Sequence, residues 1–240
     1  PPAYGTMFAD NPKNPYGVDV NGYFRWIDIG NRDNVVNDSL VDVNVGTNID
    51  LANDMTLEAY YTYSDYRSTS IGKYYLSYGG QAENAYYEVT DPEQYLANLK
   101  TTTLNDDRMR MQKVFAGLQF DLMDMAGGTA VGYVAAEAFD VDYRADVDGQ
   151  SEAGLVGGTA GNSAQGARSV KAISAEAILP VTDFIEVDVA VRYDDYDDFG
   201  SEVSPRVGAT FTMIDDLTVK ASYGQGFRAP DLSDLYGATS

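Results

Sequence analysis

Strict alternation of apolar and polar residues near the end of the chain is the feature that most limits how it can fold. One parity carries Ile185, Val187, Val189, Val191 and Tyr193, and the other carries Glu186, Asp188, Ala190, Arg192 and Asp194. The same period continues over 206–213 and 217–223. A period of two gives a strand one apolar and one polar face. The region is therefore predicted to form β-hairpins with one face against an apolar medium and one against water.

The same pattern extends through most of the chain. Five further stretches alternate, and a sixth, Tyr23–Ile29, does so with a blurred phase, which makes about nine strands in all. In one of them a charge, Glu137, falls on the parity of the apolar residues, so a β-bulge is expected there. The five stretches are 41–51, 57–64, 113–122, 129–144 and 169–179. The fold class is predicted to be all-β and antiparallel.

The connections between these strands are of two kinds. Short polar turns are expected near residues 53, 125, 182 and 215, and long polar loops over 67–107 and 146–168; the brief connection 198–201 departs from this rule. Within the first loop, Asp91-Pro92-Glu93 is a helix start signal. A loop of about forty residues is too long for a compact soluble domain unless it is functional. Short turns at one rim and long loops at the other are typical of a transmembrane β-barrel.

Composition excludes several classes of function. The 240 residues include no Cys and no His, which rules out disulfides, Cys/His metal sites and His-dependent nucleophilic catalysis. A formal charge of -21 argues against nucleic acid as a partner, because phosphate binding needs a basic face. The 19 Tyr and 23 Gly suit the aromatic belts and flexible loops of an outer-membrane barrel. No apolar run approaches the length of a membrane-spanning helix.

Two local patterns resemble metal, catalytic or nucleotide-binding sites, but each lacks features that such a site needs. The acidic run Asp194–Asp198 could suggest a calcium site or a glycosidase pair, yet Phe199 stands where an EF-hand needs an oxygen ligand. The glycines at Gly157 and Gly158 lack the spacing and the following helix of a nucleotide-binding loop. We therefore predict no enzyme activity, no metal and no cofactor.

Three motifs carry a resemblance to a known family. They are Arg192–Gly200, Ser204–Gly208 and the run Ala221–Pro230, which Leu235 and Tyr236 follow shortly. Together they resemble the middle of the barrel of TonB-dependent outer-membrane receptors. The most specific part is the end of the third motif, whose family residues are Tyr223, Gly226, Phe227, Arg228, Ala229 and Pro230. Receptors for very different cargoes are similar at these positions.

The resemblance implies an architecture and a function. Residues 1–240 would be a contiguous part of a 22-strand barrel in the bacterial outer membrane, without the plug domain and the C-terminal strands. The whole receptor would contact outer-membrane lipid, and its plug would contact the TonB complex. It would take up a scarce, large solute, first of all a ferric siderophore, with oligosaccharide or cobalamin as alternatives. A passive porin and a soluble carbohydrate-binding β-sandwich are the rivals from other classes.

Two sets of candidate site residues follow. Aromatic residues of the first long loop are candidates for ligand contact, and charges on the polar parity are candidates for the lining of the lumen. Arg228 and Pro230 are expected to fix the exit from their strand rather than to touch a ligand. The ligand-contact set is Tyr74, Tyr75, Tyr78, Tyr86 and Tyr87, and the lumen set is Glu186, Asp188, Arg192, Asp194, Arg206 and Lys220.

Overall fold

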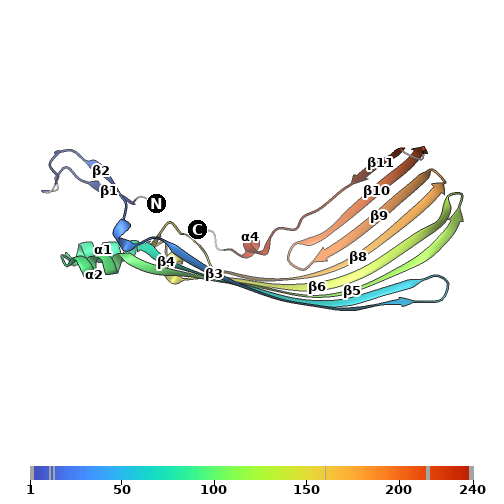
Figure 1. Cartoon of the computed structure of the whole chain (residues 1–240), viewed down its shortest axis with the longest axis horizontal. Helices are drawn as coiled ribbons and strands as arrows, with labels where there is room; N and C mark the ends of the chain where they lie inside the picture. The colour runs from blue at the N-terminus through green and yellow to red at the C-terminus, as the bar shows by residue number, and fades with distance from the viewer. Residues whose placement is uncertain (1–2, 11, 13, 160, 215–216, 238–240) are drawn as a thin grey trace.

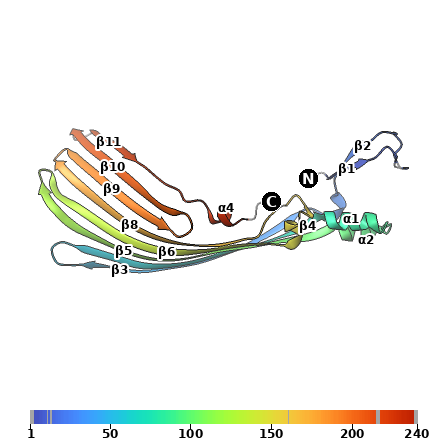
Figure 2. The same cartoon turned by 180° about the vertical axis from the view of Figure 1, so that it is seen from behind.

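A single curved antiparallel sheet makes up most of the molecule (Figure 1, Figure 2). The computed structural model describes residues 3–10, 12, 14–159, 161–214 and 217–237. The sheet order is β11-β10-β9-β8-β6-β5-β4-β3, and the two-residue β7 (Val156–Gly157) pairs with β4 off this path. The long strands are β3 (Asp33–Asp50), β4 (Thr56–Ser77), β5 (Lys100–Met125), β6 (Gly128–Val147), β8 (Ala164–Thr182), β9 (Ile185–Tyr196), β10 (Gly200–Ile214) and β11 (Leu217–Gly224).

The predicted strand Tyr23–Ile29 is wrong. Only its first two residues are strand, at the end of β2 (Val20–Phe24), and among the described residues β2 pairs only with β1 (Ala3–Met7) in a separate two-stranded sheet. The chain then forms a short 3-10 helix, Ile27–Ile29. This turn places Ile29 in a small buried cluster with Leu76 and Leu99. Burial of that side chain stabilises the turn over an extended continuation.

The turns at one end of the sheet are short, as predicted. Asn53 and Asp54 link β3 to β4 in left-handed conformation, with φ of 59° and 54°, and Gly128 begins β6 with φ of 134°. Asparagine, aspartate and glycine are the residues that adopt positive φ most readily. The turn expected near residue 215 lies outside the described residues. The brief connection between β9 and β10 is also confirmed.

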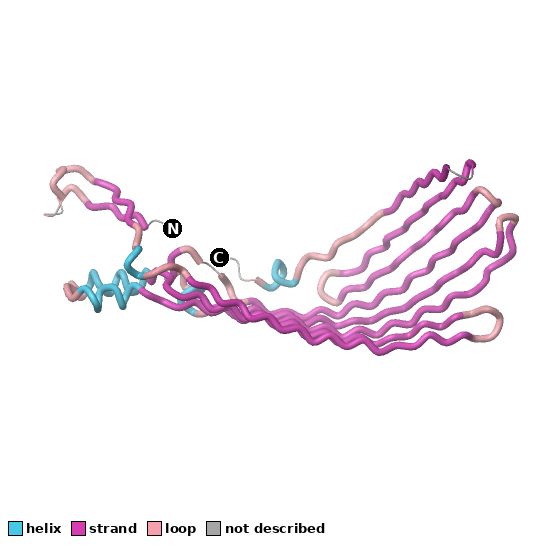
Figure 3. The backbone as a smooth tube through the Cα atoms, viewed as in Figure 1, coloured by secondary structure: helices cyan, strands magenta, loops and turns pink. Residues whose placement is uncertain are grey.

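The segment 67–107, predicted as a loop, consists mostly of strand and helix (Figure 3). β4 continues to Ser77 and β5 starts at Lys100, and the helices α1 (Tyr78–Tyr86) and α2 (Pro92–Leu99) join them. The helix start is confirmed, since the Asp91 carboxylate accepts a hydrogen bond from the Glu93 amide. Likewise β6 reaches Val147, and α3 (Gly149–Glu152) occupies part of the loop predicted over 146–168. None of the helices in the described ranges is long and apolar enough to cross a membrane.

The β-bulge predicted at Glu137 is also wrong. β6 pairs without interruption with β5 from Val131 to Val147, and with β8 from Val131 to Ala145. The residue that breaks the pattern is not displaced; the polarity of the two faces changes instead. Around Glu137 the sheet exchanges its apolar and polar sides.

This exchange is clearest on β6. Its convex face reads Val134, Ala136 and Ala138 and then turns charged with Asp140, Asp142 and Arg144, whereas the concave face turns apolar beyond Glu137 with Phe139, Val141 and Tyr143. β5 changes in the same way, from Val114 to Arg110 on the convex face and from Lys113 to Met109 on the concave face. A convex face that is apolar only near the short turns is what a membrane-spanning band followed by a solvated wall requires.

Candidate functional site

The concave face collects the charges that the sequence assigned to the lumen. The cross-strand register places the even residues of β9, β10 and β11 on one face. Arg206 and Asp188 lie 3.7 Å apart there, and the Asp188 carboxylate lies over Gly208. The six predicted residues of the lumen set therefore lie on one face, although they do not form one contiguous cluster.

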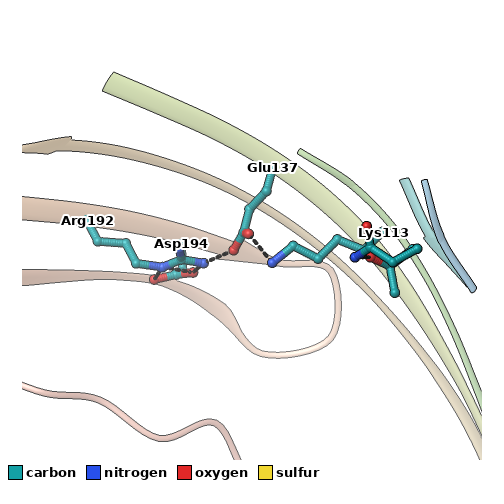
Figure 4. A network of polar contacts seen from close by, with 6 residues as sticks. Lys113, Glu137, Arg192 and Asp194 are labelled. Carbon is teal, nitrogen blue, oxygen red and sulfur yellow. Dashed lines mark hydrogen bonds and ion pairs between the residues drawn. The ribbon is translucent and has the colours of Figure 1, made fainter. Parts of the chain in front are cut away.

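The most connected part of this face is a four-residue network of Lys113, Glu137, Arg192 and Asp194 (Figure 4). Lys113 Nζ lies 2.5 Å from Glu137 Oε2, and the Arg192 Nη2 group contacts the other Glu137 oxygen. Arg192 Nε also donates to both oxygens of Asp194, at 2.9 and 3.0 Å. The Glu137 side chain is 8% exposed, so the two cations compensate a carboxylate that has lost most of its water.

The network joins strands that are not neighbours. Arg192 on β9 reaches Glu137 on β6 across β8, where Ala172 and Ser174 stand in the intervening positions. Small side chains on β8 leave room for the guanidinium to lie across the sheet. The network therefore ties three strands beyond the backbone hydrogen bonds. Sequence reasoning named Arg192 and Asp194 but missed Lys113 and Glu137, whose only signal was the phase change at Glu137.

Beyond the network, the concave face is aromatic and apolar. A hollow of about 400 Å³ lies between this part of the wall and α4 (Leu232–Tyr236). The wall side of the hollow is formed by one charged residue, Arg168, and by the apolar and aromatic residues Met109, Phe139, Val141, Tyr143 and Tyr196. Such side chains suit a partner with an apolar or aromatic surface. Sequence reasoning did not identify this surface. It placed Phe139, Val141 and Tyr143 on the apolar parity of their strand and assigned no face to Met109 or Tyr196.

The segment after β11 folds back over this surface and contains the family motif. The Phe227 ring stacks on Phe199, with centroids 5.0 Å apart, and Arg168 donates to the Pro230 carbonyl at 2.9 Å. Arg168 also pairs with Asp198, and both side chains are at most 10% exposed. Arg228, in contrast, is 83% exposed and pairs with Asp231. The Phe227 ring and the Pro230 carbonyl thus anchor the segment to the wall, whereas the Arg228 side chain contacts only Asp231 of the same segment.

The tyrosines proposed for ligand contact lie on regular elements rather than on an irregular loop. The first two are near the end of β4, where the Tyr75 hydroxyl contacts Asn34 and the Arg32 guanidinium lies over its ring. Tyr78 and Tyr86 belong to α1, and Tyr87 follows it; the last two are 81% and 68% exposed. Tyr74, with φ of 60°, packs near Gly30. The five residues do not surround one pocket.

The acidic run 194–198 is divided between partners. Asp194 pairs with Arg192, and Asp198 pairs with Arg168. Asp197 accepts a hydrogen bond from the Ser169 amide. Among the described residues, no group of three His, Cys, Asp or Glu side chains could hold a metal ion. Through Arg168, Asp198 connects the β9–β10 turn to the Pro230 carbonyl of the returning segment.

Comparison with known proteins gives one family. The sequence model described as "TonB dependent receptor-like, beta-barrel" matches residues 2–240. The vitamin B12 transporter BtuB of Vibrio cholerae is 34% identical over 50 residues, which is 21% of this chain and 8% of that protein. The chain thus matches only a small part of the length of these curated relatives.

Two solved structures are similar in shape. A chain of the RagAB peptide transporter superposes with a TM-score of 0.53 at 14% identity, covering 83% of this chain and 23% of that one. The siderophore receptor PirA from Pseudomonas aeruginosa superposes with a TM-score of 0.46 at 15% identity, covering 81% and 34%. At such identity the likeness to the RagAB chain shows the fold alone.

Proposed function

Because this chain belongs to the TonB-dependent receptor family through its β-barrel domain, we propose that it forms part of the wall of a transporter for TonB-energised uptake of a scarce, large solute. Proteins of this family lie in the outer membrane and act as receptors and transporters. Family membership argues against the two alternatives from other classes, a passive porin and a soluble carbohydrate-binding β-sandwich.

The proposed domain arrangement rests on the edges of the sheet. In the described residues β3 pairs only with β4, and β11 pairs only with β10. Strand edges left open within a membrane would expose unpaired backbone groups, which lipid cannot satisfy. We place the plug domain and the strands that close a 22-strand barrel in the rest of the whole protein, with residues 1–240 as a contiguous part of the barrel.

In this proposal the concave face supplies the polar lining of the lumen. Energy from the TonB complex reaches the plug, whose movement opens a path along that lining. The network around Glu137 lies at the level where the apolar band of the convex face ends. Charges survive at this depth because they face water, the plug or each other rather than lipid.

The single observation that favours a ferric siderophore as the cargo is the aromatic hollow beyond this network. Met109, Phe139, Tyr143 and Tyr196 offer apolar and aromatic contacts to a chelator with an organic shell. An oligosaccharide, with hydroxyl groups on all sides, would leave more of them unpaired against such a wall. Cobalamin is the second candidate, because the BtuB match lies above 30% identity, although it covers only 50 residues.

Sequencing the gene on both sides of this chain tests the family function. A plug domain with a TonB-contacting segment on the N-terminal side, and about ten more alternating strands on the C-terminal side, are expected from the 22-strand architecture. Continuous coding sequence without either would contradict the proposal.

Binding measurements on the whole receptor test the cargo. Ferric siderophores, cobalamin and an oligosaccharide would each be titrated while protein fluorescence is followed. We expect saturable binding of a ferric siderophore that Tyr143→Ala weakens about tenfold or more, the loss of one buried aromatic contact. The matched control is Tyr223→Ala, on the convex face, where the ring is 75% exposed. Binding of cobalamin without binding of a ferric siderophore would make cobalamin the first candidate for the cargo.

A further inference from the structure

One carboxylate of the concave face, that of Asp107 on β5, has no partner within the described part of the chain. The residue is half-buried, and its side chain forms no hydrogen bond or ion pair there. The carboxylate of Glu137, on the same face, contacts two cations. A charge that loses part of its water without gaining a counter-charge costs free energy. An unpaired carboxylate in the wall of a transport path is therefore a candidate for contact with a solute.

The positions around Asp107 hold no cation. In the register it lies between Ser68 of β4 and Ala145 of β6. Along β5 its neighbours on the same face are Asn105 and Met109. β5 is paired on both sides over this stretch, so no further strand can enter the sheet beside Asp107. A counter-charge for this carboxylate must therefore come from the space above the concave face.

Two tyrosines flank the next position of the same face. Met109 lies directly opposite Tyr66 of β4 on one side and Tyr143 of β6 on the other, so both rings are diagonal neighbours of Asp107. Tyr143 lies close enough to the Asp107 carboxylate to interact with it electrostatically. The Tyr66 hydroxyl donates to a second carboxylate, Asp38, at 3.3 Å. A carboxylate beside aromatic rings suits an ammonium group, which gains an ion pair and cation–π contacts there.

This position adjoins the aromatic hollow under the returning segment. Met109 and Tyr143 belong to the wall of that hollow of about 400 Å³, which continues away from Asp107 toward Phe139 and Tyr196. A solute in the hollow would lay an organic shell against these side chains. Its end toward the long connections would then lie beside the Asp107 carboxylate.

The charged residues that line the hollow itself are already matched. Arg168 pairs with Asp198, and both side chains are at most 10% exposed. Asp231 of the returning segment pairs with Arg228 at 2.8 Å. On the side of the hollow formed by β5 and β6, Asp107 is therefore the charge that keeps no partner among the described residues.

We propose that Asp107 determines specificity, because its carboxylate pairs with a protonated amine of the cargo while Tyr66 and Tyr143 contact the carbon atoms around that amine. The cargo is thus a ferric chelate with a positive charge on its organic shell. The formal charge of -21 favours the approach of such a solute and opposes that of an anionic chelate. The inference rests on the proposed function, since it names the charge of the proposed siderophore.

The test compares two forms of one ferric chelate on the whole receptor, followed by protein fluorescence. The probes are ferrioxamine B, which ends in a primary amine, and its N-acetyl derivative, which has no charge there. Ferrichrome without and with an added primary amine is a second pair of another shape. The amine forms are expected to bind about tenfold more tightly, or better, as a charge-assisted hydrogen bond implies.

The two ways to fail are distinguishable. Equal binding of the amine and neutral forms would overturn the role of Asp107 and leave a ferric siderophore as the cargo. Binding of neither pair would contradict the siderophore itself, and with it the inference that rests on it.

Variants locate the amine. Asp107→Asn should weaken binding of the amine form about tenfold and leave that of the N-acetyl form unchanged. Asp107→Lys should reverse the preference, in favour of the N-succinyl derivative, which carries a carboxylate. The control with the same change of charge as the first variant is Asp142→Asn, on the convex face of β6, exposed and without an ion pair among the described residues. An equal loss of preference in the control would contradict the assignment. If Asp107→Lys does not assemble, Asp107→Asn decides.

A final arm separates the cargo from the receptor itself as the source of the cation. A lysine or arginine of the plug domain would supply the same chemistry. In that case Asp107→Asn would lower the temperature at which the receptor without cargo loses its heat-resistant migration, and the two forms of the chelate would bind equally. That result would overturn the proposal. The expected temperature is unchanged or higher, because the variant removes an uncompensated carboxylate.

Discussion

At the scale of single residues, the most constrained side chain is Glu137. Its carboxylate is nearly buried, and it is compensated by cations from two other strands, Lys113 and Arg192. Removing one partner of a buried charge pair destabilises a protein more than replacing the whole pair with neutral residues, because the remaining charge is left buried without compensation. The same residue also marks the level at which the two faces exchange polarity.

Glu137→Gln is expected to destabilise the barrel by about 1–3 kcal/mol, since two cations lose their counter-charge. The measurement is the temperature at which the whole receptor loses its heat-resistant migration in gels. Glu186→Gln, also on the concave face but without an ion pair among the described contacts, is the control. Equal midpoints for the two variants would show that the network does not contribute to stability.

Asp148 gives a prediction on pH in the connection after β6. Burial alone would raise the pKa of its carboxyl, but hydrogen bonds from Ser151 and from the Leu104 and Gln150 amides outweigh burial and hold that pKa below its ordinary value. A lowered folded-state pKa means that the stabilisation is complete above the unfolded pKa of 3.8 and is lost as the pH falls through the folded value.

Hydrogen exchange tests the predicted loss of stabilisation at low pH. Amides of 149–155 should exchange faster below pH 4 than at pH 6, after correction for the intrinsic rates. In Asp148→Asn the exchange should be fast at both pH values, because the amide cannot replace the carboxylate as a multiple acceptor. Unchanged protection in acid would mean that the Asp148 hydrogen bonds do not hold this turn.

At the scale of elements, the strands differ along their length rather than from one another. Near the short turns, the convex face of the strands is apolar and the concave face of most strands is polar. Beyond the level of Glu137, β5 and β6 carry charge outside and aromatic side chains inside. The reversal follows the surroundings, because the convex face meets lipid at one level and water at the next.

The assignment of side chains to the convex and concave faces can be tested on β9. Val189 lies on the convex face between Ala177 and Val207, whereas Asp188 lies on the concave face near Arg206. Val189→Arg in the whole receptor should impair barrel assembly by about 2–4 kcal/mol, the cost of a lipid-facing arginine at the bilayer midplane. Asp188→Arg should have a much smaller effect on heat-resistant migration. Equal effects would reverse the assignment of faces.

At the scale of the whole molecule, the described residues form one open sheet with two edge strands, β3 and β11. The helices α1 and α2, the short strand β7 and the turn at Ile29 gather at the end of the sheet opposite the short turns (Figure 1). No closed core buries the apolar convex face: Val41, Val114, Ile173 and Val191 are all more than 40% exposed. In the proposed barrel, lipid and the remaining strands would cover what this chain leaves open.

The isolated 240-residue chain is therefore expected to aggregate or to remain in an open form in detergent, without the heat-resistant migration of the whole receptor. The measurement compares the two proteins in gels with and without heating. Unpaired edges and an uncovered apolar face are the physical reason. A compact, heat-resistant species formed by the chain alone would contradict the partial-barrel assignment.

The amino-acid sequence by itself determined the alternating parts of the eight long strands, the sides of most strands near the short turns, the start of α2 and the family motif. These features depend on neighbours within one strand or one turn, where a period of two or a capping residue is sufficient. Within this range the sequence also placed Arg192, Asp194, Arg206 and Lys220 on the face that the structure makes concave.

Only the tertiary structure decided which side chains contact one another across strands. The contact of Glu137 with Arg192 passes over β8, and the opposition of Arg67, Arg108 and Arg144 depends on the registers of β4, β5 and β6 together. Register is set by pairing between distant segments, and a shift by one residue reverses every side chain. In the sequence, the polarity exchange at Glu137 resembled a β-bulge. Along one strand, an exchange of the apolar and polar faces and an inserted residue shift the alternation of apolar and polar residues in the same way.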